Sequence, residues 1–208
     1  MKFNLLISRQ RRRFIEGGMA LATLFLSACT DTLSSKTSKF DSIDITSADY
    51  AKDFFLTDQD GQTRSLQDFR GKIVVVFFGF TQCPDVCPTT MAELSEVRQV
   101  LGQDASKLQT ILITVDPERD TLPVLKAYMA NFDPSFVALR PTLEQLKTVA
   151  TDFKIYYKKV GDSKTAYSVD HTAGTYIFDA QGRIRLFGRY GSGAQVLAGD
   201  IRRLLEGA

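Results

Sequence analysis

Three residues of this chain carry soft metal-binding side chains. The sequence contains a single histidine, His171, and only three cysteines. Cys83 and Cys87 form a Cys-x-x-x-Cys pair, and His171 follows far downstream in Val-Asp-His-Thr. Two thiolates and one imidazole suit copper(I) or zinc, which bind sulfur and nitrogen donors. The sequence therefore predicts a three-donor metal site, which would distinguish a metal carrier from an ordinary dithiol oxidoreductase.

The spacing of the two cysteines also suits redox chemistry. A separation of four residues predicts that both thiols lie on one face of a helical turn. That turn follows a strongly apolar strand at 73–80, so the thiols are expected at the carboxyl edge of a sheet, where α/β proteins place ligands. A helix N-terminus also lowers the pKa of a thiol and favours the thiolate. A structural disulfide between Cys83 and Cys87 is the remaining interpretation.

Acidic residues near the candidate ligands have two interpretations each. Asp170 precedes His171 and could orient the imidazole or add a weak oxygen ligand to copper(II). It could equally be a surface carboxylate at the end of a strand. Residues 116–120, Asp-Pro-Glu-Arg-Asp, follow a second apolar strand and are expected at the same sheet edge. They could shape a pocket or a partner surface, or form a purely structural loop.

The first 28 residues have the features of an export signal. Basic residues precede an uncharged, largely apolar stretch at 17–28, which is shorter than the ~20 residues that a membrane-spanning helix needs. Leu26-Ser27-Ala28-Cys29 resembles a bacterial lipobox, so Cys29 is predicted to be lipidated. Arg11-Arg12-Arg13 resembles a twin-arginine export signal. The alternatives are a plain secretory signal with a chance cysteine and an uncleaved signal anchor.

The predicted organisation has three parts: a signal at 1–28, a lipidated cysteine with a flexible polar tether at 29–48, and one folded domain at 49–208. Removing the signal leaves 21 of the 26 basic residues and 23 of the 24 acidic residues, so the net charge changes from +2 to −2. The excess of basic over acidic residues therefore comes from the signal and gives no support for binding nucleic acid. The expected location is the bacterial cell envelope, lipid-anchored to a membrane and facing the periplasm.

Hydrophobic periodicity predicts alternating strands and helices, followed by hairpins. Unbroken apolar runs at 73–80 and 108–115 suit buried strands. The expected helices span about 84–102, 121–132, 142–153 and 193–205, and the expected hairpins pair 54–56 with 63–66, 154–160 with 166–169, and 173–178 with 183–188. The pattern predicts an α/β, thioredoxin-like fold: a central mixed sheet flanked by helices, with an N-terminal β-hairpin and an inserted hairpin.

Three motifs together resemble the Sco/SenC copper chaperones of cytochrome oxidase assembly. They are Phe-Phe-Gly-Phe-Thr-Gln-Cys83-Pro-Asp-Val-Cys87-Pro, Val-Asp-Pro-Glu-Arg-Asp-Thr at 115–121, and Val-Asp-His171-Thr. The resemblance covers roughly residues 50 to 205. It implies that Cys83, Cys87 and His171 bind one copper ion per domain, with a side left open for ligand exchange. It also implies a function: delivering copper to, or keeping reduced, the dinuclear copper site of cytochrome c oxidase subunit II.

A thiol–disulfide oxidoreductase acting on exported proteins is the alternative. Thioredoxin-type oxidoreductases place a cis-proline beside the dithiol, whereas the last proline here is Pro141 and Asp170-His171-Thr172 stands at the corresponding position. This difference favours a non-enzymatic metallochaperone, although one dithiol can serve both activities. Expected partners are the oxidase subunit or a similar exported copper protein, an upstream copper donor or thiol reductant, and a membrane. Zinc ranks below copper as the metal.

Overall fold

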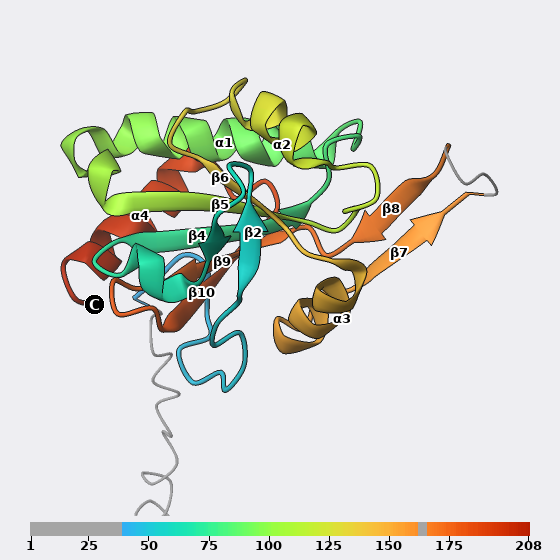
Figure 1. Ribbon diagram of the computed structural model, residues 1–208. Helices are drawn as coiled ribbons and strands as arrows, with labels where there is room; N and C mark the ends of the chain where they lie inside the picture. Colours follow the sequence, from blue (N-terminus) through green and yellow to red (C-terminus); the bar gives the residue numbers. More distant parts are fainter. Residues whose placement is uncertain (1–38, 162–165) are drawn as a thin grey trace, which may run out of the picture. The chain divides into compact units, whose positions relative to one another are not determined.

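The fold is built on an eight-stranded mixed sheet, shown in Figure 1. The computed structural model describes residues 39–161 and 166–208. The sheet has the order β1-β10-β9-β4-β5-β6-β2-β3. Its strands are β1 (Ile43–Asp44), β2 (Leu56–Asp58), β3 (Thr63–Arg64), β4 (Ile73–Gly79), β5 (Leu108–Thr114), β6 (Val137–Arg140), β9 (Gly174–Phe178) and β10 (Ile184–Arg189). β4, β5 and β6 run parallel and the outer strands pair antiparallel, which confirms the predicted mixed sheet.

The centre of the sheet is the parallel pair β4 and β5. Every residue of both strands is buried, and Gly79 lies opposite Thr114 where their register ends. Strands that are covered on both faces are apolar along their whole length, as the sequence of these two strands predicts. Because both strands end at the same edge, the segments that follow them, 80–86 and 115–121, lie next to each other.

Four α-helices cover the sheet: α1 (Val86–Leu101), α2 (Leu122–Met129), α3 (Leu143–Asp152) and α4 (Ala194–Leu205). Two short 3-10 helices, Leu66–Phe69 and Gly102–Lys107, complete the helical elements of the described ranges. α1 packs against α4. Successive residues of a strand point to opposite faces, and Phe78 of β4 contacts Phe153 at the end of α3 while Gly79 faces Cys87 of α1. α1 and α3 therefore cover opposite faces of the sheet.

The three predicted hairpins are present. β2 and β3 pair through a turn in which Gly61 has a φ of 81°, a left-handed conformation that favours glycine. β9 and β10 form the C-terminal hairpin. The inserted hairpin consists of β7 (Tyr157–Val160) and β8 (Ser168–His171), which form a two-stranded sheet of their own. Figure 1 shows this hairpin extending away from the main sheet.

β6 is an element that the sequence pattern does not predict. Its four residues pair parallel with β5 and antiparallel with β2. Four residues between two helices are too few for a period to be recognised. Arg140, the last residue of β6, donates to the carbonyl oxygens of Pro117 and Asp120, so this strand supports the loop at the carboxyl edge of β5.

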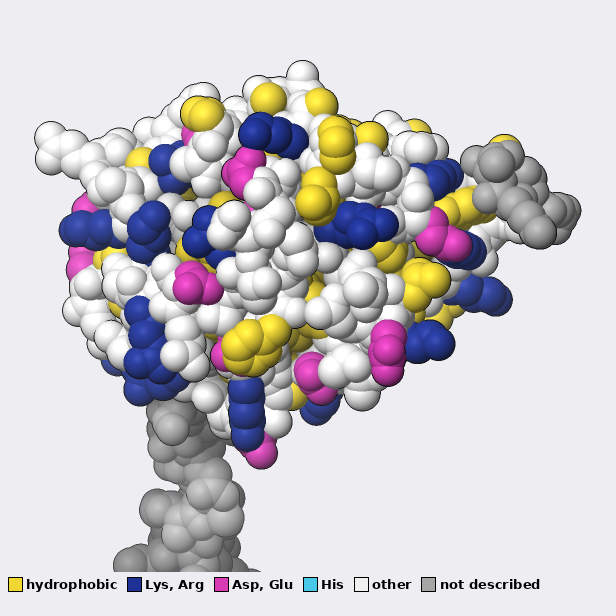
Figure 2. Space-filling view, in the orientation of Figure 1, with side chains coloured by type: hydrophobic (Ala, Val, Ile, Leu, Met, Phe, Trp, Pro, Cys, Tyr) yellow, Lys and Arg dark blue, Asp and Glu magenta, His cyan; other side chains and the backbone are white. Residues whose placement is uncertain are grey.

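Charged side chains of both signs are scattered over the face of the domain that Figure 2 shows. Lysine and arginine side chains are interspersed there with acidic ones. None of the helices within the described ranges is both long and apolar enough to cross a membrane.

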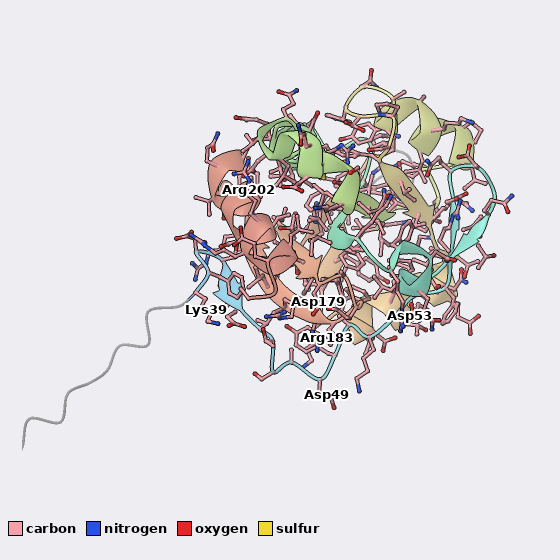
Figure 3. The ribbon with its side chains drawn as sticks, turned by 90° about the vertical axis from the view of Figure 1, so that its left-hand side faces the viewer. Lys39, Asp49, Asp53, Asp179, Arg183 and Arg202 are labelled. Carbon is pink, nitrogen blue, oxygen red and sulfur yellow. The ribbon has the colours of Figure 1, made fainter. Side chains whose placement is uncertain are left out.

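The ordered domain begins earlier than residue 49, so the predicted tether at 29–48 is too long. Phe40 is only 5% exposed, and β1 pairs with β10. The carboxylate of Asp200 in α4 accepts hydrogen bonds from the N–H groups of Asp41 (3.0 Å) and Ser42 (2.8 Å). In Figure 3 the segment that begins at Lys39 lies beside this helix. The polar composition of the segment concealed these contacts, because one phenylalanine and two N–H groups give no periodic signal.

Candidate metal centre

Cys83, Cys87 and His171 converge, as the sequence analysis predicts for a metal site. Their sulfur and nitrogen atoms all lie within 4.8 Å of one another. His171 Nε2 is 3.4 Å from Cys87 Sγ, although 84 residues separate the two in sequence. Within the described ranges, no other group of three or more histidine, cysteine or acidic residues is arranged to hold a metal ion. Cys29, the predicted lipidation site, lies outside the described residues.

The two cysteines occupy different elements. Cys87 lies in the first turn of α1 and is fully buried, whereas Cys83 lies in the preceding loop and is partly exposed. The expectation that both thiols share one face of a helical turn is therefore wrong. Instead, Cys83 Sγ accepts the N–H of Cys87 at 3.4 Å, while the side chain of Asp85, which precedes the helix, accepts none. The first N–H groups of a helix lack intrahelical partners, so the sulfur of Cys83 meets one of them.

Burial dominates the ionisation of Cys87. It raises the pKa of the Cys87 thiol, and the neighbouring Cys83 raises it further. The predicted pKa-lowering effect of the helix N-terminus is therefore outweighed at Cys87. Because a thiolate is the form that binds metal, a cation entering the site must displace the proton of Cys87.

The imidazole of His171 is already oriented as a ligand. Its Nδ1 lies 3.0 Å from the carbonyl oxygen of Thr172, which can only accept, so Nδ1 carries the proton and the lone pair of Nε2 faces Cys87. Burial lowers the pKa of His171, which keeps the ring neutral. The rings of Phe77 and Phe80 lie edge-on to the imidazole, each with its centroid 5.9 Å away. These contacts present a neutral nitrogen donor to the thiols.

Asp170 does not orient the imidazole, contrary to one of its two predicted roles. Its side chain is exposed, and it precedes His171 in β8, so the two side chains point to opposite faces of the hairpin. The carbonyl of Thr172 occupies the position next to Nδ1 instead. In the strand register Asp170 lies opposite Lys158. The geometry thus favours the surface interpretation of this carboxylate.

The loop at 116–120 fixes the cysteine-bearing segment. Asp120 is fully buried and accepts two hydrogen bonds from Thr81, one from its N–H (3.1 Å) and one from its hydroxyl (2.6 Å). The hydroxyl of Thr114, at the end of β5, donates to the same carboxylate at 2.5 Å. Burial raises the pKa of Asp120. This role of Thr81 is not predicted from the sequence, because a single threonine beside a cysteine motif does not indicate a buried partner.

Gly79 permits the close approach of Cys87 to β4. A Cβ atom at this position would lie 3.0 Å from Cys87 Sγ and 2.6 Å from the ring of Phe77. Both distances are shorter than ordinary carbon contacts, so a side chain here would have to displace the thiol or the ring. The glycine of the Phe-Phe-Gly-Phe sequence therefore has a steric role at the site.

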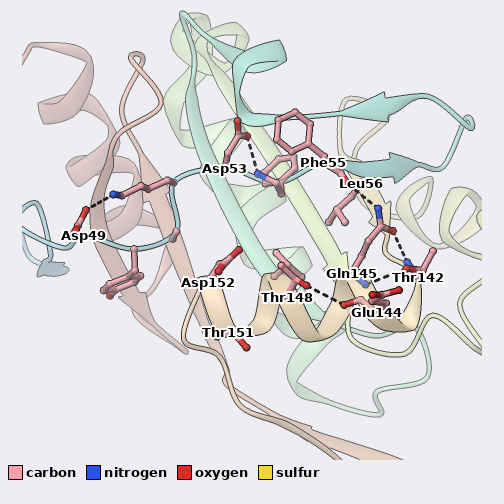
Figure 4. Close-up of a pocket in the computed structure, with 15 residues that line it drawn as sticks. Asp49, Asp53, Phe55, Leu56, Thr142, Glu144, Gln145, Thr148, Thr151 and Asp152 are labelled. Carbon is pink, nitrogen blue, oxygen red and sulfur yellow. Dashed lines mark hydrogen bonds and ion pairs between the residues drawn. The ribbon is translucent and has the colours of Figure 1, made fainter.

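A cavity of about 840 Å³ lies elsewhere, between the segment 49–56 and α3. Figure 4 shows its lining residues, among which Gln145 donates to the carbonyl oxygen of Phe55. None of the three metal-donor side chains lines this cavity. The cavity is therefore separate from the three-donor site.

Comparisons with known proteins agree with this geometry. A family profile described as SCO1/SenC matches residues 44–206. An SCO2-like protein of Rickettsia felis is 38% identical over 133 residues, which are 63% of this chain and 65% of that protein. The chain thus spans just under two thirds of the length of the first curated relatives that it matches.

Solved structures give the same picture. Bradyrhizobium japonicum ScoI with copper bound shares 39% identity at a TM-score of 0.68, covering 73% of this chain and 97% of that one. Yeast Sco1 with copper bound shares 28% identity at a TM-score of 0.69, covering 75% and 88% respectively.

Proposed function

Because the chain belongs to the SCO1/SenC family, we propose that it binds one copper ion through Cys83, Cys87 and His171. The observation that carries this proposal is the convergence of two sulfurs and one imidazole nitrogen within 4.8 Å. Soft thiolates select copper(I), and imidazole suits the same metal. The protonated Nδ1 of His171 leaves the nitrogen that faces the thiols free to bind. Structures of similar proteins solved with copper bound support the choice of metal.

The copper is cargo, and its destination is the dinuclear copper site of cytochrome c oxidase subunit II. Three donors leave copper(I) accessible to an incoming ligand, and Cys83 is partly exposed at the mouth of the site. A carrier needs this arrangement, because the recipient must contact the metal before the carrier releases it. The destination rests on the resemblance of the three motifs to the family that assembles this oxidase.

Thiol–disulfide exchange is the second candidate, favoured by the unequal exposure of the two cysteines. Cys83 can reach a partner while Cys87 is buried behind it. In this reaction the Cys83 thiolate attacks a disulfide of the target and releases one target thiol. Cys87 then displaces the second target thiol and forms the Cys83–Cys87 disulfide, so the target gains the two electrons that the dithiol loses.

The test is the copper content of protein purified under reducing conditions. The wild type should hold about one copper ion, and His171→Ala should hold far less, because the variant loses one of three metal donors. Asp170→Ala is the matched control, since its side chain is exposed on the neighbouring position of the same strand. Copper retention by His171→Ala equal to that of the wild type would remove the chaperone proposal and leave the reductase.

For the cellular location, we propose export by the N-terminal signal and anchoring through lipid on Cys29 at a bacterial membrane facing the periplasm. The export route is either the general secretory one or the twin-arginine one, whose signal Arg11-Arg12-Arg13 resembles. The lipobox-like sequence that ends at Cys29 supports this proposal. The protein should fractionate with membranes, and Cys29→Ser should block processing or release it. Recovery of all the wild-type protein in the soluble periplasmic fraction would contradict the lipid anchor.

A further inference from the structure

The hairpin that carries His171 is separate from the main sheet. In the described part of the chain, β7 and β8 pair only with each other, with Tyr157 opposite His171. The two cysteines lie instead on the segment between β4 and the first turn of α1. The hairpin joins the main sheet through Thr172 and Ala173, which lead from His171 into β9. This short link and the side-chain contacts between the hairpin and the rest of the domain together set the separation between imidazole and thiols.

Tyr167, the residue just before β8, makes several contacts of this kind, and Lys159 of β7 adds an ion pair with Glu118. The hydroxyl of Tyr167 donates to Asp116 Oδ1 at 2.6 Å. The guanidinium carbon of Arg119 lies 3.7 Å from the centroid of its ring, a cation–π geometry. Arg119 Nη1 also donates to the carbonyl oxygen of Tyr167 at 2.8 Å. One residue of the hairpin thus meets two residues of the 116–120 loop through three contacts.

Arg119 connects these contacts to the cysteine segment. Its Nη1 donates to Gln82 Oε1, beside Cys83, at 3.0 Å. Its guanidinium carbon lies 5.8 Å from the centroid of Phe80, whose ring also contacts the imidazole. Its Nε pairs with the fully buried carboxylate of Asp116. The guanidinium therefore bridges the segment that carries the thiols and the hairpin that carries the imidazole.

The base of this bridge is buried and hydrogen-bonded to the central sheet. The N–H of Asp116 donates to the hydroxyl of Thr114 at 3.0 Å, and Thr114 is the last residue of the fully buried β5. The side chain of Arg119 is only 14% exposed, so its ion pair with Asp116 is largely screened from water. Charge-assisted hydrogen bonds are shorter and stronger than bonds between neutral groups, and the planar guanidinium adds geometric specificity.

We propose that Tyr167 is a positioning residue for the nitrogen donor: held by Asp116 and Arg119, it keeps the hairpin where His171 meets the two thiols. The inference rests on the proposed copper function and adds a residue to it. Tyr167 touches none of the three donor atoms and acts through the placement of β8.

The main test compares copper(I) affinity in matched variants. Loss of partners that orient a metal ligand typically weakens metal binding by about 10–100-fold, and this is the loss expected for Tyr167→Ala. Tyr167→Phe keeps the ring beneath Arg119 and loses only the hydroxyl bond, so its loss should be smaller. Val160→Ala, at an exposed position of the same hairpin, is the control and should bind like the wild type. If Tyr167→Ala fails to fold, Tyr167→Phe carries the test.

A second background separates positioning from general stability. Because Tyr167 acts through His171, adding Tyr167→Ala to a His171→Ala protein should weaken copper binding no further. The copper(II) form should show the same pattern: Tyr167→Ala loses the nitrogen hyperfine splitting of the imidazole and keeps the thiolate-to-copper absorption. An equal loss of affinity in both backgrounds would overturn the proposal.

A measurement on the copper-free protein tests the positioning role of Tyr167 separately from the copper function. In the copper-free protein, ¹⁵N relaxation should report greater motion of residues 168–172 in Tyr167→Ala than in the wild type. Val160→Ala should show no such increase. If the wild type and His171→Ala hold copper equally, the proposed copper function is wrong. The relaxation measurement alone then tests whether Tyr167 positions the hairpin. Unchanged motion of the hairpin in Tyr167→Ala would then reject the positioning role of Tyr167.

Discussion

At the scale of single residues, the site depends as much on a missing side chain as on the three donors. Gly79 lies at the end of β4, where a Cβ atom would be 3.0 Å from Cys87 Sγ. The donor geometry therefore depends on the absence of a side chain at this position of β4. A larger residue at position 79 would shift the thiol of Cys87 and would leave the donor atom itself unchanged.

Gly79→Ala should destabilise the domain by about 1–3 kcal/mol, the usual range for overpacking a buried site. It should also weaken copper binding, because Cys87 or Phe77 must move. Gly199→Ala in α4 is the control: nothing lies within 4 Å of the new Cβ, and alanine stabilises a helix interior by roughly 0.5–1 kcal/mol. Urea unfolding of both variants provides the comparison, and equal stability of Gly79→Ala and the wild type would contradict the steric role.

The two thiols couple copper binding to redox state. Oxidation to a Cys83–Cys87 disulfide removes both thiolates, so the oxidised protein should bind copper orders of magnitude more weakly than the reduced protein. Cys83→Ser cannot form this disulfide and keeps only one of the two sulfur donors, so it should bind copper weakly before and after oxidation and should show a weaker thiolate-to-copper absorption in the copper(II) form. Copper titrations before and after treatment with a thiol oxidant, with recovery on reduction, test this. Equal affinities in the two redox states would exclude these sulfurs as donors.

At the scale of elements, the turn between β9 and β10 depends on one buried carboxylate. Asp179 accepts the N–H groups of Gln181 and Arg183, each at 3.0 Å, and pairs with the guanidinium groups of Arg183 and Arg185. Figure 3 shows Asp179 beside Arg183. Burial opposes the ionisation of Asp179, but the hydrogen bonds and charge of Arg183 together hold its pKa below the ordinary value of 3.8.

This lowered pKa predicts a pH dependence of stability. The unfolded chain binds a proton at Asp179 near pH 3.8, whereas the folded protein resists protonation to lower pH. The stabilisation by Asp179 is therefore complete above that value and is lost as pH falls through the folded pKa. Asp179→Asn should unfold at lower urea concentration than the wild type at pH 7, and the gap should narrow between pH 4 and pH 2. A gap that stays constant over this range would argue against the carboxylate as its source.

At the scale of the whole molecule, residues 39–48 are part of the domain. A chain that begins at residue 39 keeps the burial of Phe40 and the pairing of β1 with β10, and a chain that begins at residue 49 loses both. Burying a phenylalanine contributes about 1.5–3 kcal/mol, so the shorter chain should be less stable by at least that amount. Urea unfolding measures the difference.

Asp200 supplies the control for this comparison. Its carboxylate binds the N–H groups of residues 41 and 42, so Asp200→Asn should destabilise the longer chain more than the shorter one. Equal stabilities of the two chains would show that the N-terminal segment contributes nothing to the fold.

The sequence by itself determined the elements whose patterns are long or chemically specific. The unbroken apolar runs of β4 and β5, the apolar period of α1 and the three hairpins are all present in the structure. The types of the donor residues and the motifs around them also predicted that Cys83, Cys87 and His171 come together. Local preferences and donor chemistry are properties of residue type, so they can be recognised before the chain folds.

The tertiary structure alone decided how the site is held together. It placed Cys83 outside the helix, gave the orientation of His171 to the carbonyl of Thr172, and joined Asp120 to Thr81 across 39 residues. It also made β6 and residues 39–48 parts of the domain, although their sequences are too short or too polar to predict their burial. Each of these contacts joins segments that no local pattern relates, because burial and hydrogen bonding between distant residues are fixed only when the sheet brings them to one edge.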